Sequence, residues 1–298
     1  MVRRGRRYIG LCILLFFIVG GFVLWTLYKR DSAGLGQINV AIDGDPIIIA
    51  SWQPDGERLV IVTIPASFTA QAVRGLGRYP VGSLWQLGSM EGLSGDVFRQ
   101  SLEELIALPI QWSMSGISQS ELFSLRSLPR VLFGEIKTNM SFASYLAVWW
   151  KVLTISRDHI VEIPLGASVV TDESQADGTN TAVISLEAVD RALTDEFELP
   201  SIRDEKLTVA VSNTTATAGL AEHVARMINR IGGNVTALGN EDVKLGGCQI
   251  RGTQKHLDSV TSRVLTRIFD CEPVVSEGEA YADIVVAVGT RYESRFVP

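Results

Sequence analysis

The stretch VAVSNTTATAGLAEHVARMINRIGGNVTAL, residues 209–238, decides the fold of the C-terminal part of the chain. Its first residues continue an apolar run, residues 207–212, that is typical of a buried strand. Residues 220–231 repeat apolar side chains at helical spacing, and Gly232-Gly233 then suits the left-handed turn that ends a helix. A second apolar run, residues 235–238, predicts the next strand.

The polar turn between this strand and this helix is predicted to be a connection, not a phosphate site. It lacks the Lys-Ser/Thr pair of a P-loop and the GxGxxG pattern of dinucleotide-binding loops. Capping and turn geometry explain its Thr and Gly residues. Further strands are predicted at residues 248–250, 273–275 and 283–288, and a helix at residues 259–269. Residues 205–298 are therefore expected to form a small α/β sandwich.

The N-terminus carries a predicted membrane anchor. Residues 8–28, YIGLCILLFFIVGGFVLWTLY, contain no charged side chain, and as a helix they would span about 31 Å, which matches the hydrocarbon core of a bilayer. Four arginines precede the run and only Lys29 and Arg30 follow it. The positive-inside rule therefore predicts a cytoplasmic tail and transmembrane helix in residues 1–30.

Everything after residue 30 is then expected outside the cell membrane, beginning with a short linker, residues 31–37. The alternative is a cleaved signal peptide, for which Ser32-Ala33-Gly34 supplies small residues, although its apolar region would be unusually long.

The charge balance limits the partners of the external part. Beyond residue 30 the chain has 21 basic and 33 acidic side chains, a net charge of −12. The deficit lies in residues 31–205, because residues 206–298 hold ten of each sign. Such a part does not favour nucleic acid, whose binding needs Lys and Arg to displace counterions.

The chain has three cysteines. Cys12 lies in the apolar run. Cys248 and Cys271 belong to no CxxC motif or histidine cluster, so no metal site is predicted. In an oxidising compartment these two are expected to form a disulfide, which would stabilise the fold by about 3 kcal/mol on the chain-entropy model.

Residues 38–200 are predicted to form a second external domain. Residues 46–52 and 58–64 alternate as a hairpin around a Pro-Asp-Gly turn. Residues 74–95 are rich in Gly and predict a loop, whereas residues 96–108 have the apolar spacing of a helix.

Three more helices are predicted at residues 120–133, 141–153 and 185–197, with a polar loop at residues 172–181 and a boundary at residues 200–205. Ser141 is expected to cap the second of these helices. Trp149 and Trp150, near its end, are interpreted as core residues and not as a platform for a ligand.

The C-terminal pattern resembles the C-terminal domain of LytR-type envelope proteins. The shared features are an apolar strand, Asn with Thr, Gly-Leu-Ala at the start of an amphipathic helix, Gly before a second strand, and a closing apolar strand. The residues that carry them are Val209-Ala210-Val211, Asn213-Thr214, Gly219-Leu220-Ala221, Gly232, Asn240 and Ala282–Gly289.

The preceding region resembles the catalytic domain of LytR–CpsA–Psr proteins. Those are single-pass proteins that transfer glycopolymers from polyprenyl pyrophosphate lipids to the cell wall. Asp45–Pro65 is similar to the family's strand–turn–strand that ends in Ser-Ile-Pro, and Ser101–Gln111 to its helix and Leu-Pro-Ile step. Asn139–Leu146 and Asp177-Gly178 fit the later part. The resemblance implies an α/β fold and a role in cell-envelope biogenesis.

The charged residues of the family pattern are only partly present. The family has Arg-x-Asp before the first strand and Arg-Asp after Ser-Ile-Pro, whereas this chain has Asp43-Gly44-Asp45 and Ala66-Ser67. Asp45 is the one catalytic candidate, as a vestige, and Arg74, Arg78 and Arg99 are candidate anion contacts. Each lost charge-assisted phosphate contact removes about 1.5–3 kcal/mol, so two losses lower catalysis by several decades.

Two functions follow from this pattern. The first is a membrane-anchored, non-catalytic envelope protein that binds a cell-wall polymer or another envelope protein and needs no cofactor. The alternative is an active glycopolymer phosphotransferase with relocated basic residues, which would use Mg²⁺. A transcription regulator is disfavoured by the external topology and the acidic charge.

Overall fold

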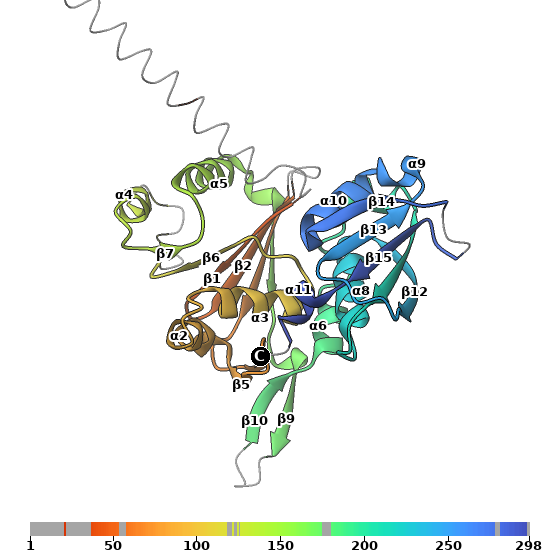
Figure 1. Ribbon diagram of the computed structural model, residues 1–298. Helices are drawn as coiled ribbons and strands as arrows, with labels where there is room; N and C mark the ends of the chain where they lie inside the picture. Colours follow the sequence, from red (N-terminus) through yellow and green to blue (C-terminus); the bar gives the residue numbers. More distant parts are fainter. Residues whose placement is uncertain are drawn as a thin grey trace, which may run out of the picture.

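The computed structural model describes residue 21 and residues 37–53, 58–117, 121, 124, 126–174, 180–277 and 281–296 (Figure 1). Within these residues, no helix has the length and apolar character needed to cross a bilayer. The predicted anchor lies outside them apart from Gly21, and the predicted linker apart from Gln37.

The largest sheet is built around the predicted hairpin. Its order is β7-β6-β1-β2-β3-β8. Its strands are β1 (Ile38–Ile42), β2 (Ile47–Gln53), β3 (Arg58–Ile64), β6 (Trp112–Ser115), β7 (Lys137–Thr138) and β8 (Ile160–Pro164). β2 and β3 pair antiparallel from Ile47↔Ile64 to Gln53↔Arg58, which confirms the hairpin, while its predicted turn at residues 54–57 lies outside the described residues.

Helices cover both faces of this sheet (Figure 1). They are α2 (Leu84–Met90) and α3 (Asp96–Ile106) on one face, and α4 (Ser127–Leu132) and α5 (Phe142–Thr154) on the other. Since side chains alternate along a strand, Val62 packs with Leu102 of α3 in one core, and Val40 packs with Trp149 of α5 in another. Ser141 caps α5 as predicted, because its Oγ accepts a hydrogen bond of 3.1 Å from the backbone N–H of Ser144.

The prediction of a loop over residues 74–95 is wrong. That segment contains β5 (Gly77–Pro80), the 3₁₀ turn η2 (Val81–Ser83) and α2. Leu84 and Trp85 of α2 are buried in the core that contains Val62 and Leu102. Gly88 allows the close approach, since a Cβ there would lie 2.1 Å from the carbonyl oxygen of Ser94. The glycines therefore serve packing, which composition alone does not reveal.

The polar loop predicted over residues 172–181 is also wrong in its described part. Residues 170–174 and 180–184 form two antiparallel strands of a second sheet, while residues 175–179 lie outside the described residues. The order of that sheet is β5-β4-β10-β9, with β4 (Thr69–Ala72), β9 (Val170–Ser174) and β10 (Asn180–Ile184). Backbone pairing forms these strands although their side chains are largely polar.

Several predicted helices have shifted ends. α3 ends at Ile106 because Ala107 takes a left-handed conformation with φ 52°. The described residues contain only α4 of the helix predicted over residues 120–133. The remaining helices between the sheets are α6 (Leu186–Ala192), which is shorter than predicted, and α7 (Pro200–Arg203), at the predicted boundary.

The C-terminal part shows the predicted alternation of strands and helices. A mixed sheet of order β12-β11-β15-β13-β14 carries α8 and α10 on one face. Its elements are β11 (Thr208–Asn213), α8 (Leu220–Arg230), β12 (Asn234–Asn240), β13 (Cys248–Gly252), α9 (Gln254–Leu257), α10 (Val260–Phe269), β14 (Cys271–Val275), β15 (Ile284–Val288) and α11 (Thr290–Glu293). Cys248 and Cys271 are register partners on β13 and β14 and form a disulfide, as predicted.

Two arginines of α8 join this part to the rest of the fold. The guanidinium of Arg226 donates to the carbonyls of Glu104 and Leu105, at 3.1 and 3.4 Å. Arg230, which is buried, donates to the carbonyls of Ile106 at 3.1 Å and Leu193 at 2.8 Å. Both pair with the carboxylate of Asp190 on α6. The C-terminal carbonyls of α3 thus find their partners on α8.

We expect Arg230→Met to lower the free energy of unfolding by about 3–5 kcal/mol, because it leaves buried carbonyls and part of a carboxylate without a donor. Urea denaturation followed by circular dichroism measures the change. Arg267→Met, at an exposed position of α10, is the matched control and should change stability by less than about 0.5 kcal/mol. Equal effects of the two substitutions would contradict the role given to Arg230.

Candidate functional site

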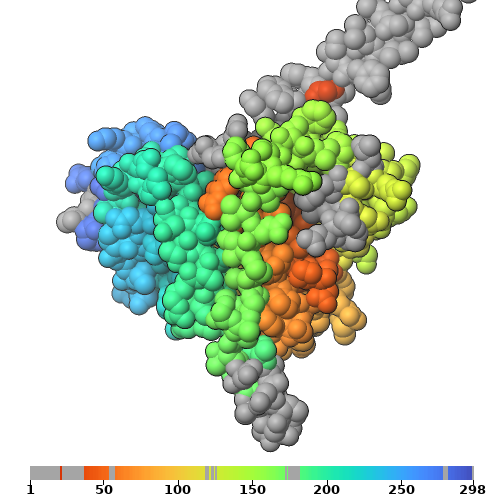
Figure 2. Space-filling view, turned by 180° about the vertical axis from the view of Figure 1, so that it is seen from behind, coloured from red at the N-terminus to blue at the C-terminus, as the bar shows by residue number. Residues whose placement is uncertain are grey.

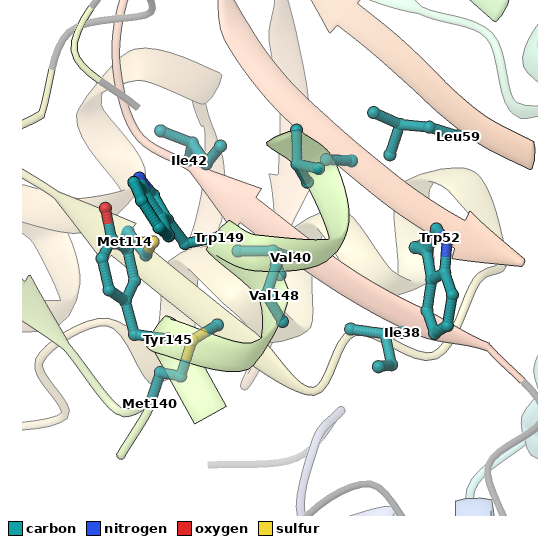
Figure 3. Close-up of a pocket in the computed structure, with 12 residues that line it drawn as sticks. Ile38, Val40, Ile42, Trp52, Leu59, Met114, Met140, Tyr145, Val148 and Trp149 are labelled. Carbon is teal, nitrogen blue, oxygen red and sulfur yellow. The ribbon is translucent and has the colours of Figure 1, made fainter. Parts of the chain in front are cut away.

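An apolar cavity of about 40 Å³ lies between the first sheet and α5 (Figure 3). Every residue that lines it has an aliphatic, thioether or aromatic side chain. The lining residues are Ile38, Val40, Ile42, Ala50, Trp52, Leu59, Met114, Met140, Tyr145, Val148, Trp149 and Val152. Figure 3 shows Trp52 and Leu59 at one end, Met114, Tyr145 and Trp149 at the other, and Val148 between them.

The local sequence explains this wall. Alternate residues of β1 point to the α5 side of the sheet, and the wall includes one residue in two from Ile38 to Ile42. α5 contributes Tyr145, Val148, Trp149 and Val152, whose spacing of three and four residues places them on one helix face. β2 contributes the small side chain of Ala50, which leaves the space unfilled.

The polar atoms of the wall are already bonded. The hydroxyl of Tyr145 donates to Ser127 Oγ at 2.6 Å, and the indole N–H of Trp149 donates to the carbonyl of Ser124 at 3.4 Å. Both partners lie in or next to α4. An apolar space of this kind stays dry and accepts hydrocarbon more readily than a polar group.

The predicted catalytic candidate lies on the turn that follows Ile42. Asp45 is exposed, and one of its oxygens accepts a long hydrogen bond of 3.5 Å from the backbone N–H of Ala66. Asp43, in the same turn, is half-buried and accepts a hydrogen bond of 2.8 Å from Ser115 Oγ. The turn that carries Asp43 and Asp45 therefore follows directly on Ile42, the last residue of β1 in the cavity wall.

The three arginine candidates do not meet at this turn. Arg78 pairs with Glu173 at 2.5 Å, on the second sheet. Arg99 donates to Glu103 at 3.1 Å and to the carbonyl of Ile110 at 2.8 Å, which fixes it beside α3. Among the described residues, no arginine forms an ion pair with Asp43 or Asp45.

Arg74 lies elsewhere again. Its backbone is left-handed with φ 60°, and its N–H donates to the carbonyl of Arg295 at 2.6 Å. Its side chain lines a separate cavity of about 220 Å³ together with Glu104, His223 and Phe296. Its Nε is buried and, within the described residues, has no hydrogen-bond partner.

Asp43 and Asp45 do not by themselves form a cluster of metal ligands. Asp43 and Asp45 have separate partners, Ser115 and the backbone of Ala66. The part of the chain that the structure describes holds no group of three or more His, Cys, Asp or Glu side chains that could bind a metal ion.

Sequence reasoning did not predict the cavity. The interpretation of Trp149 as a core residue is confirmed, because it is 8% exposed and packs in the second core. The same interpretation of Trp150 is wrong, because its side chain is 62% exposed. The alternation of apolar residues in β1 indicates a face that packs against another element. It does not show that the small side chain of Ala50 on β2 leaves a space under α5.

No protein-family model and no curated protein sequence matches this chain. Solved structures that are similar to part of it include B. subtilis TagV, with 8% identity over 53% of this chain and 94% of that chain and a TM-score of 0.39. B. subtilis TagT, described as a LytR-CPS2A-psr family protein with bound octaprenyl pyrophosphate lipid, has 10% identity, coverages of 53% and 88% and a TM-score of 0.38.

A transcriptional regulator from Enterococcus faecalis, EF0465, has 10% identity, coverages of 52% and 84% and a TM-score of 0.40. Proteins of the LytR–CpsA–Psr group are thus among the structures that this fold resembles.

Asp43 gives a pH-dependent prediction. Burial raises the pKa of Asp43 above its ordinary value of 3.8, and the hydrogen bond from Ser115 opposes that rise. The ionised carboxylate therefore destabilises the native state at pH 7. We expect Asp43→Asn, which keeps an acceptor for Ser115, to raise the free energy of unfolding by less than about 1 kcal/mol.

This gain should shrink as the pH falls towards 3.8 and vanish well below it, because Asp43 is then protonated in both the native and the unfolded state. Urea denaturation at pH 7 and at pH ~3 measures it. Ser115→Ala is the control and should destabilise at pH 7, since it removes the donor. A loss of stability on Asp43→Asn at pH 7 would contradict the assignment.

The cavity gives a second prediction. We expect Ala50→Val to raise the free energy of unfolding by up to about 1 kcal/mol, because added methyl groups fill a void that costs about 24 cal/mol per Å³. Thermal and urea denaturation measure it. Ala147→Val, on the same helix as Val148 but outside the cavity lining, is the control and should show no such gain. Strong destabilisation by Ala50→Val would show that the space is not available.

Proposed function

We propose that this chain is a membrane-anchored, extracytoplasmic protein of cell-envelope biogenesis. In this proposal it binds the apolar chain of a polyprenyl lipid and does not transfer the head group. Three features support the proposal: the apolar run at residues 8–28, the resemblance of residues 45–65 and 209–240 to LytR–CpsA–Psr proteins, and the apolar cavity. The observation that carries it is the cavity, whose wall is apolar throughout.

The cavity selects hydrocarbon by its chemistry. Its bonded Tyr145 and Trp149 offer no free polar group, so a ligand gains by removing apolar surface from water. Its volume of about 40 Å³ is smaller than a long chain requires. Entry of a ligand therefore requires α5 to move away from β1 and β2. Tyr145 and Trp149 of α5 donate to Ser127 and Ser124, so such a movement would carry the α4 segment with it or break these hydrogen bonds.

The surroundings of Asp45 support binding without transfer. A pyrophosphate needs bidentate cationic partners, and the transfer step needs its developing charge to be offset. Arg78 and Arg99 already pair with Glu173 and Glu103. The net charge of −12 beyond residue 30 opposes a further anion at this surface.

The proposal is tested by photocrosslinking of the full-length chain in nanodiscs with a polyprenyl pyrophosphate that carries a photoreactive group on its apolar end. We expect the label on peptides from β1, β2 and α5. Ala50→Val should lower labelling severalfold because it fills the space, whereas Ala147→Val should not change it. Labelling that is spread over the surface, or unchanged by Ala50→Val, would contradict lipid binding in the cavity.

A parallel assay with Mg²⁺ and a glycopolymer-linked polyprenyl pyrophosphate distinguishes binding from transfer. We expect no release of the polymer by the wild type or by Asp45→Ala, with equal lipid labelling of both. Release that Asp45→Ala abolishes would establish the alternative, an active phosphotransferase.

A further inference from the structure

Four large apolar side chains are exposed on the α4 and α5 segments. We call them the outer patch: Leu132 at 59% exposure, Phe133 at 77%, Trp150 at 62% and Leu153 at 49%. α4 and α5 contact one another. In Figure 2 the yellow-green α4 segment and the light-green α5 lie together in the upper part of the molecule. The outer patch therefore lies on two segments that contact one another.

The fold does not require these side chains to be apolar. α5 already covers the sheet with the cavity-lining residues of one face. Leu146, Trp150 and Leu153 follow one another at spacings of four and three residues, which defines a second apolar stripe on the same helix. Its first residue, Leu146, is partly buried against the core that contains Trp149. A helix with two apolar stripes is typical of an element that is covered on both sides. Among the described residues, nothing covers the second stripe at Trp150 and Leu153.

The charge around the outer patch differs from that of the whole external part. Residues 126–159 contain five basic and two acidic side chains, in a region that is otherwise strongly acidic. Lys151 and Arg157 form no ion pair with any described residue, whereas Lys137 lies on the other side of the sheet, beside Trp85 and Asp96. The ammonium of Lys151 lies 5.0 Å from the centre of the Trp52 ring, between the cavity and the surface. This local excess of positive charge is complementary to lipid phosphates.

The start of the fold lies next to the same helix. Ile38, at the beginning of β1, lines the cavity together with Val148 and Val152 of α5. If residues 8–28 span the membrane, residues 29–37 are all that separate the bilayer from β1. Extended chain covers at most about 3.6 Å per residue, so this connection reaches about 30 Å. α5 is thereby kept close to the membrane surface.

We propose that the outer patch docks on the outer surface of the bilayer. Trp150 and Phe133 then lie at the boundary of head groups and acyl chains, where aromatic side chains are favoured, and Lys151 and Arg157 lie near lipid phosphates. The helix that closes the cavity is thus placed at the lipid phase from which a polyprenyl chain would enter. The docking rests on the proposed anchor and is independent of ligand binding in the cavity.

The test uses the full-length chain in nanodiscs that contain anionic lipid. A spin label is attached at Leu153→Cys in a Cys12→Ala background, where Cys248 and Cys271 are held in their disulfide. The matched control is a label at Val275→Cys, which is 63% exposed on β14. We expect the ratio of oxygen to nickel-complex accessibility to be about threefold higher at position 153 than at position 275. Adding Trp150→Glu and Phe133→Glu should lower that ratio to the value at position 275.

Equal ratios at positions 153 and 275 would overturn the docking. A label at position 153 that is shielded from both reagents would also overturn it, because that result indicates a protein partner on the outer patch. The intact mass of the purified chain separates failure of the anchor from failure of the docking. A chain cleaved after residue 30 overturns both, whereas a full-length chain with a water-exposed label overturns the docking alone.

Discussion

The C-terminal end of α3 is the point on which the rest of the structure depends. A helix leaves its last carbonyls without partners, and a buried carbonyl without a donor costs about 1–3 kcal/mol. Here Arg226 and Arg230 of α8 bind the carbonyls of residues 104–106, and Asp190 holds both guanidinium groups. Burial lowers the pKa of Arg230, and Asp190 opposes that fall. The last carbonyls of α3 therefore have donors, and the two arginines of α8 have acceptors, only when the C-terminal sheet packs against α3.

The same helix also holds the end of the chain. Arg295 donates to Glu103 at 3.0 Å, and the hydroxyl of Tyr292 donates to Glu104 at 3.0 Å. Burial raises the pKa of Glu103, although Arg295 and Arg99 oppose it. These pairs lie within the large core that includes residues of all three sheets. Arg99, a candidate for anion binding by sequence, also pairs with Glu103.

The two faces of the first sheet consequently differ in how firmly they are covered. On the α3 side, ion pairs and helix-end hydrogen bonds fix the helix against the sheet and the C-terminal part. On the α5 side, apolar side chains provide the contact with the sheet, and the space beside Ala50 stays unfilled. The cavity and the exposed Trp150 both belong to the α5 side of the sheet.

The sequence by itself determined the elements whose signals are local. The hairpin of β2 and β3, the cap of Ser141 on α5 and the strand–helix order after residue 207 follow from periodicity and capping residues, which act over a few positions. The pairing of Cys248 with Cys271 followed from cysteine count. Only the tertiary structure decided that residues 74–95 contain α2, that Arg99 binds Glu103, and that Ala50 faces a gap under α5. Each of these depends on contacts between elements that are distant in the sequence. The spacing of residue types along the chain does not determine which helix and strand surfaces pack together.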